Sequence, residues 1–143
     1  MRALGIDLGS KRIGVATSDR SGTIATPLTV LKRSGSRETD YQAIAELVTE
    51  YEIECVVVGL PLHMNGNYGD AAKSAVAEVQ QLTSVLSVPV LTFDERRTTV
   101  TADNILIEQN MNAQERRKVI DKVAAAVMLQ SWLDGRKMTE SNS

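Results

Sequence analysis

Three carboxylates stand in the sequence where they could act together: Asp7, Glu95 and Asp121. Asp7 ends an apolar run that predicts a buried strand, and Glu95 closely follows a second such run, "VPVLTF". Ligands of open α/β sheets bind at the carboxyl ends of the strands, so both acids are expected at that edge. Asp121 lies in a predicted helix, where the small residues Ala124 and Ala125 would let the helix backbone approach the sheet and bring Asp121 toward Asp7.

Carboxylates that share a site repel one another and need a cation if all are to stay ionised. Hard oxygen ligands of this kind suit Mg²⁺ or Mn²⁺. Two such ions about 4 Å apart can activate water and stabilise the leaving oxygen of a phosphodiester. Zinc and Ser-His-Asp chemistry have little support, because the chain holds one cysteine, Cys55, and one histidine, His63. The acids therefore predict metal-dependent hydrolysis of phosphodiesters.

Each acid also has a simpler interpretation. Asp7 would accept backbone N–H bonds from the turn that follows it, Asp121 would pair with Arg117 on the helix surface, and Glu95 would be a solvated loop charge. Asp94 is an alternative to Glu95, because neighbouring strand residues point to opposite faces. Geometry leaves this choice open. The strand before Glu95 is expected two places from the first strand, which puts Glu95 about 10 Å from Asp7, a long reach for a ligand of a single ion.

Basic residues flank all three acids, and lysine and arginine are the usual contacts of nucleic-acid phosphates. The net charge is −2, so binding must rest on local clusters, and ordinary solvated surface is the alternative interpretation. The sole histidine is expected in a loop, as a polar residue or a substrate contact. The candidate substrate-binding residues are Lys11, Arg12, His63, Asn65, Arg96, Arg97, Lys118 and Lys122.

Hydrophobic periodicity predicts a mixed five-stranded sheet of order 3-2-1-4-5 with helices on both faces, an α/β fold of the ribonuclease H-like plan. Gly9 would allow a tight turn after the first strand, and Gly14 would let a phosphate or a helix come close. Expected strands cover residues 4–8, 13–18, 24–31, 54–59 and 88–93, with Pro27 indicating an edge strand. Helices are expected from a capping box at Thr39–Gln42, from a cap at Asp70, over 99–109, and from Asn112 with Glu115 to Leu133.

The chain has 143 residues, which predicts one domain over 1–134, and residues 135–143 read as a polar, mobile tail. Aromatic residues make up only 3%, so the core must be aliphatic. One cysteine inside an apolar run fits a reducing cytoplasm. Neither a signal peptide nor a run of 18 apolar residues is seen, so a cytoplasmic protein without a membrane partner is expected.

Four segments in order, "DLGSKRIGVATSD", "VVVGLPLHMNG", "DERRTT" and "IDKVAAAVMLQSWLD", together resemble the RuvX/YqgF family. The resemblance covers nearly the whole chain, up to about Asp134. It implies a fold similar to the RuvC resolvases, catalytic and metal-binding acids at Asp7, Glu95 and Asp121, and substrate contacts in the loop Gly59–Gly66 and after Glu95. Relatives often carry asparagine where His63 stands.

The leading hypothesis is a metal-dependent endonuclease on structured RNA or branched DNA, and the resemblance makes 5′-end processing of precursor 16S rRNA in ribosome biogenesis the first choice. Holliday-junction resolution, which would require two active sites and hence a homodimer, is one alternative. A non-catalytic nucleic-acid or transcription-associated module is another. An actin-like ATPase, which also begins with Asp-x-Gly, would need two domains around its nucleotide. No motif decides between RNA and DNA, because that depends on contacts to the 2′-hydroxyl.

Overall fold

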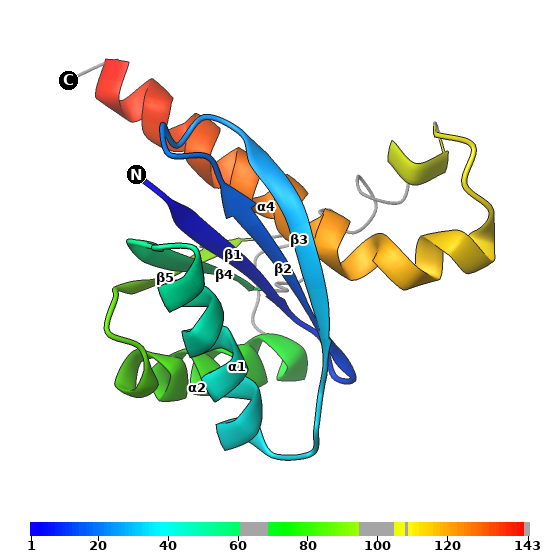
Figure 1. The fold of residues 1–143 in the computed structure, drawn as a ribbon, viewed down its shortest axis with the longest axis horizontal. Helices are drawn as coiled ribbons and strands as arrows, with labels where there is room; N and C mark the ends of the chain where they lie inside the picture. The colour runs from blue at the N-terminus through cyan, green and yellow to red at the C-terminus, as the bar shows by residue number, and fades with distance from the viewer. Residues whose placement is uncertain (61–68, 95–104, 108, 142–143) are drawn as a thin grey trace.

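The computed structural model describes residues 1–60, 69–94, 105–107 and 109–141 (Figure 1). Its strands are β1 (Ala3–Leu8), β2 (Arg12–Ser18), β3 (Ala25–Lys32), β4 (Cys55–Leu60) and β5 (Val90–Asp94). Its helices are α1 (Arg37–Glu50), α2 (Asp70–Val85) and α4 (Ala113–Ser141), and residues 105–107 are also helical.

The five strands form one sheet of order β3-β2-β1-β4-β5, as the sequence predicts for the ribonuclease H-like plan. The first three strands pair antiparallel, whereas β4 pairs parallel with both β1 and β5. Pro27 lies on β3 at the edge of the sheet, where its missing N–H is tolerated. This order makes β1 the central strand, so its carboxyl end is flanked on both sides.

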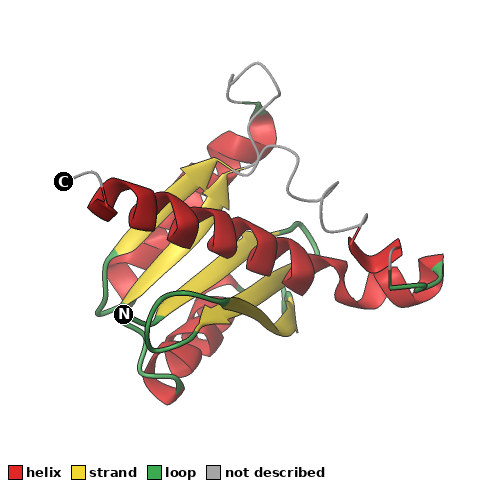
Figure 2. Ribbon diagram, turned by 90° about the horizontal axis from the view of Figure 1, so that it is seen from above, coloured by secondary structure: helices red, strands yellow, loops and turns green. Residues whose placement is uncertain are grey.

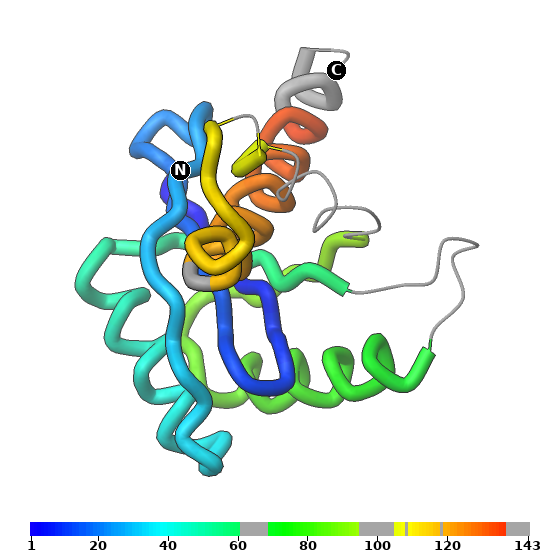
Figure 3. Tube along the Cα trace, turned by 90° about the vertical axis from the view of Figure 1, so that its right-hand side faces the viewer, coloured from blue at the N-terminus to red at the C-terminus, as the bar shows by residue number. Residues whose placement is uncertain are grey.

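Helices cover both faces of the sheet, with α1 and α2 on one face and α4 across the other (Figures 2 and 3). The α1/α2 face buries branched aliphatic residues such as Ile6, Val56 and Val58 against Ile44 and Leu82. The α4 face is built from smaller residues, with Ala3, Ala16 and Ala125 among its buried members. Small side chains on this second face bring the backbone of α4 close to the strands.

Of three predicted helix starts, the structure confirms one and contradicts two. Asn112 accepts from Glu115 N at 2.8 Å and donates its own N–H to the Glu115 carboxylate at 3.4 Å, which confirms the predicted capping box. The predicted box at Thr39 is wrong, because α1 begins at Arg37 and Ser36 accepts from Thr39 N. Asp70 is the first residue of α2 and not its cap, since Gly69 holds that position.

The last helix is longer than predicted. It continues to Ser141 and passes Leu133, the expected end, so the segment read as a tail begins as helix. The Arg136 guanidinium lies 4.9 Å from the centre of the Trp132 ring, one helical turn away, and this contact favours continued helix. Of the helix expected over 99–109, residues 99–104 and 108 lie outside the described residues. No helix in the described ranges is long and apolar enough to cross a membrane.

Candidate active site

Asp7 lies near the carboxyl end of β1, two residues before the turn into β2. It pairs with Gly14 of β2, and Gly5 pairs with Ala16. Residues directly opposite each other in an antiparallel pair project to the same face, and alternate residues of a strand share a face. Ala16 belongs to the core beneath α4, so Asp7 lies on the α4 face of the central strand.

The backbone of α4 lies directly against this part of the sheet. A Cβ built on Gly14 would overlap the carbonyl of Asp121. A Cβ on Gly5 would lie 2.9 Å from the Cβ of Leu129 and 3.2 Å from the carbonyl oxygen of Ala125. Of the two uses predicted for Gly14, the structure shows the close approach of a helix. Gly14 therefore stands between Asp7, its partner in the sheet, and Asp121, its neighbour in the helix.

Asp121 is held at this position by an ion pair with Arg12, the first residue of β2. The Nε of Arg12 lies 2.8 Å from Oδ2 of Asp121, and the two residues are 109 positions apart in the sequence. The sequence offered Arg117 as the partner of Asp121, whereas the structure pairs it with a strand residue. The side chains are 49% and 23% exposed, so the pair orients Asp121 more than it stabilises the fold.

Three of the predicted basic residues lie on the segments next to these two acids. Lys11 is exposed in the turn after β1, and Lys122 follows Asp121 on α4, where it is half-buried. Arg12 completes the group, although its guanidinium is bonded to Asp121. The side chain of Lys118 lies outside the part of the chain that the structure describes, as do His63, Asn65, Arg96 and Arg97.

Asp94 and Glu95 are the two candidates for the third acid. Asp94 ends β5 and pairs with Leu60 of β4. Along β5, Val90 packs against the α1/α2 core and Phe93 against the α4 core, so alternation puts Asp94 on the α1/α2 face, away from Asp7. Glu95 is outside the described residues. Within the described ranges, no three acidic, histidine or cysteine side chains group as a metal site.

The donors that the structure does place fit a hard divalent cation. Asp7 and Asp121 lie on one face at the carboxyl edge of the central strand, and both offer carboxylate oxygens, the ligands that Mg²⁺ and Mn²⁺ prefer. No side chain at Gly14 intervenes between them. A third ligand would have to come from outside the described residues.

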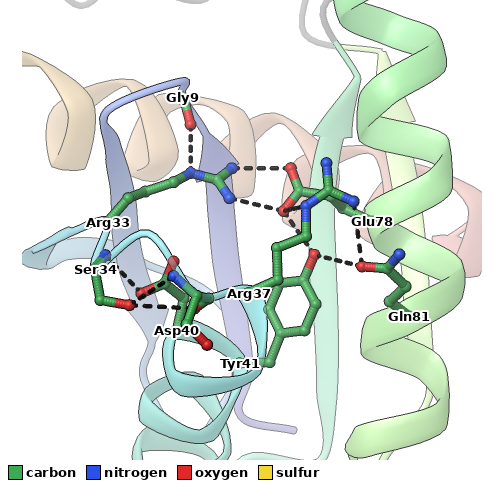
Figure 4. Close-up of polar contacts among 9 residues, drawn as sticks. Gly9, Arg33, Ser34, Arg37, Asp40, Tyr41, Glu78 and Gln81 are labelled. Atoms are coloured by element: carbon green, nitrogen blue, oxygen red, sulfur yellow. Dashed lines mark hydrogen bonds and ion pairs between the residues drawn. The ribbon is translucent and has the colours of Figure 1, made fainter.

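A second polar cluster, which was not among the predicted site residues, lies beside the turn between β1 and β2, where Arg33 reaches Gly9 (Figure 4). Arg33 donates to both oxygens of the Glu78 carboxylate at 2.8 Å each, and Tyr41 Oη donates to Oε1 at 2.6 Å. Burial raises the pKa of Tyr41, as does its bond to Glu78. For Glu78 burial also acts to raise the pKa, but the bonds from Arg33 and Tyr41 outweigh it and hold the pKa below its ordinary value.

One feature of the sequence does point to this cluster. Glu78 lies on the apolar stripe of α2, between Ala75 and Leu82, and it is only 4% exposed. A charged residue at such a position must be paired. Its partners come from other elements, so periodicity alone cannot name them. A cavity of about 380 Å³ lies beside the cluster, with Gly9, Ser10 and Arg37 among its lining residues.

Comparison with known proteins identifies the family. The model of the family described as "RuvX: Holliday junction resolvase" matches residues 1–135. The chain is 44% identical over 138 residues to a "Putative pre-16S rRNA nuclease" of Thermoanaerobacter pseudethanolicus, covering 96% of this chain and 99% of that one. A protein of the same name from Caldanaerobacter subterraneus subsp. tengcongensis is 48% identical over 138 residues, covering 96% and 99%.

A solved structure shares the fold. The structure described as "T. thermophilus RuvC in complex with Holliday junction substrate" superposes with a TM-score of 0.62, covering 97% of this chain and 98% of that one, at 18% sequence identity. At that identity the likeness supports the ribonuclease H-like, RuvC-like fold alone. The family match over residues 1–135 and the relatives that align along nearly the whole chain show that the protein belongs to the RuvX family.

Proposed function

We propose that this protein is an endonuclease that depends on Mg²⁺ or Mn²⁺ and hydrolyses phosphodiester bonds in structured nucleic acid. The observation that carries the proposal is the close packing of the Asp121 backbone on Gly14, the residue that pairs with Asp7 at the carboxyl end of the central strand. Two carboxylates carried on neighbouring backbones would share a cation, which offsets their mutual repulsion. The names of the relatives, which describe nucleases, support the same activity.

Asp7, Asp121 and Glu95 would hold the cation. Glu95 is the favoured third ligand because the adjacent alternative, Asp94, lies on the opposite face of the sheet from Asp7 by strand alternation. The bound ion would activate water and stabilise the leaving oxygen of the phosphodiester. Arg12 keeps the Asp121 carboxylate turned toward β2, and the exposed Lys11 and half-buried Lys122 would contact substrate phosphates. His63, Asn65, Arg96, Arg97 and Lys118 remain predicted contacts.

The leading substrate is the 5′ end of precursor 16S rRNA, which the names of the relatives support. Processing of this RNA would place the protein in the cytoplasm. The description of the matching family supports a second candidate, the resolution of Holliday junctions. That reaction requires a cut in each of two strands and therefore a homodimer, whereas a single chain would suffice for RNA processing.

The two candidates separate in one assay. The full chain is incubated with RNA carrying the precursor 16S 5′ end and with a synthetic four-way DNA junction, each with Mg²⁺, with Mn²⁺ or with EDTA. We expect cleavage of the RNA with either metal and none with EDTA. Preferred cleavage of the junction by a dimeric species would favour the resolvase. Binding without cleavage at any metal concentration would contradict both and favour a non-catalytic module.

A further inference from the structure

The turn that follows Asp7 has little support of its own. We call residues Gly9–Lys11 the site turn. Ser10 and Lys11 are exposed, and the bond within the turn runs from Gly9 N to Arg12 O at 2.9 Å. Arg33, the residue that follows β3, supplies support from outside, because its Nε donates to Gly9 O at 2.7 Å and its backbone N donates to Lys11 O at 2.9 Å.

Glu78 in turn fixes the guanidinium of Arg33. Both terminal nitrogens of Arg33 donate to the two Glu78 oxygens at 2.8 Å, a fork arrangement that sets the plane and the direction of the guanidinium. The side chains are 15% and 5% exposed, so water competes little for these bonds. With its other nitrogens held in this way, Nε is directed at the carbonyl of Gly9 (Figure 4).

The contacts continue on the far side of the turn. Arg12, the next residue after the site turn, bonds to Asp121 on α4 at 2.8 Å. A continuous polar belt therefore runs around the carboxyl edge of β1: Glu78, Arg33, the site turn, Arg12 and Asp121. It connects α2 on one face of the sheet with α4 on the other, and Asp7 lies two residues before its central segment.

We propose that Glu78 is a positioning residue for the active site, and that it acts through Arg33 on the site turn to fix Asp7 and Asp121 relative to each other. The inference rests on the proposed function for its effect on cleavage. Its effect on the site turn stands independently, because the bonds from Arg33 to the turn are part of the structure whatever the protein cleaves.

Packing alone is a weak explanation of this buried pair. Taking two charges out of water is unfavourable, and apolar residues of similar volume often serve as well or better for stability. Such residues would fill the space between β3 and α2, but they would leave the Gly9 carbonyl without its donor. Catalytic groups must be held closely, since a displacement of about 1 Å can lower a rate about 100-fold.

The test compares Glu78→Gln with Tyr41→Phe in the full chain. Glutamine keeps the size of Glu78 but presents an amide to the guanidinium, so Arg33 loses its fixed direction. We expect kcat for RNA cleavage to fall at least about tenfold at nearly constant KM, and amide hydrogen exchange at Gly9 to quicken by a similar factor. Tyr41→Phe removes one bond to Glu78 but keeps the pair, and should leave both quantities within about twofold.

The proposal is overturned if folded Glu78→Gln retains wild-type kcat, or if kcat falls while exchange at Gly9 is unchanged. If Glu78→Gln does not fold, the double variant Arg33→Met/Glu78→Leu replaces the ion pair by apolar residues, and kcat and amide exchange at Gly9 are measured on it instead. Absence of cleavage by the wild-type chain would end the proposed function. Exchange at Gly9 would then still decide whether Glu78 controls the site turn.

Discussion

The two turns at the ends of β2 are held in different ways. The site turn, Gly9–Lys11, depends on Arg33, which lies beyond the next strand. We call Asp19–Ile24, at the other end of β2, the distal turn. There the carboxylate of Asp19 accepts from Thr23 N at 2.7 Å, from Ile24 N at 3.1 Å and from Ser21 Oγ at 2.8 Å, all within five residues.

This difference separates a turn whose own first side chain bonds to its backbone from a turn whose side-chain support comes from beyond the next strand. The carboxylate of Asp19 satisfies donors within the distal turn, as is common where an aspartate begins a turn. Two bonds also reach this turn from far along the chain, because the N-terminus donates to Arg20 O at 2.7 Å and Gln130 of α4 donates to Thr23 O at 2.9 Å. The site turn joins elements on both faces of the sheet, so its geometry reports the packing of α2 and α4 together. The site turn can therefore hold catalytic groups in register with residues of both helices, whereas the long-range bonds to the distal turn come from α4 and the N-terminus.

The largest effect expected from a single change is on cleavage. Asp7→Asn keeps shape but removes a charge that would hold the metal, so kcat/KM with Mg²⁺ should fall more than about 100-fold, beyond the loss typical of residues that only support a metal ligand. Asp19→Asn makes the same chemical change in the distal turn and should leave cleavage unchanged. Thermal unfolding of Asp7→Asn should match or exceed wild type, because carboxylate repulsion is relieved. A folded Asp7→Asn protein that cleaves normally would contradict the catalytic role.

The next effect is on stability. Gly14→Ala would drive a Cβ into the Asp121 backbone, and neither β2 nor α4 can yield easily, so we expect a loss of about 3 kcal/mol in unfolding free energy. Gly22→Ala in the distal turn meets a left-handed backbone (φ +70°) and one neighbouring carbonyl at 3.1 Å, for a loss of about 1–2 kcal/mol. Urea unfolding of both variants measures the difference. Equal losses would show that the α4 contact is not tighter than a strained turn.

A smaller effect is expected on substrate affinity. Lys11→Gln removes one phosphate contact, so the slope of log affinity against log salt should fall by about 1. Arg20→Gln removes a comparable charge from the exposed distal turn and should leave the slope unchanged. Binding isotherms at several salt concentrations measure both. If wild-type affinity is the same at low and moderate salt, these basic side chains do not contact substrate phosphates.

The smallest effect concerns acid stability. Hydrogen bonds from Thr23 N, Ile24 N and Ser21 lower the pKa of Asp19 from 3.8 to about 2. A carboxyl whose pKa is depressed by folding stabilises the protein above its unfolded pKa, and this contribution is lost as the pH falls through the folded value. Asp19→Asn should therefore be less stable than wild type at neutral pH, and the difference should shrink between pH 3.8 and about 2. Urea midpoints across that range measure it, with Glu46→Gln on α1 as the charge control.

Much of the fold could be predicted from the sequence, because its determinants are short-range. Alternation and β-branched runs define the strands, Pro27 marks an edge, and Asn112 with Glu115 caps α4 through contacts three residues apart. Three predictions at this range were wrong. Ser36 caps α1 in place of Thr39, Gly69 caps α2 in place of Asp70, and α4 continues past Leu133 and through Gly135. All three concern where a helix begins or ends, which depends on which of several nearby residues ends the regular pattern.

The sequence by itself determined that Asp7 would lie at a strand end and Asp121 on a helix with a small-residue face, since both follow from local pattern. Only the tertiary structure decided what surrounds them. The Arg33–Glu78 pair joins residues 45 positions apart, and the Arg12–Asp121 pair joins residues 109 positions apart. A sequence of this composition holds several carboxylates with which each arginine could pair. Which of them it meets depends on which faces of the helices and strands pack together. Long-range pairing is therefore set by the assembled layers, because no periodicity in the chain encodes it.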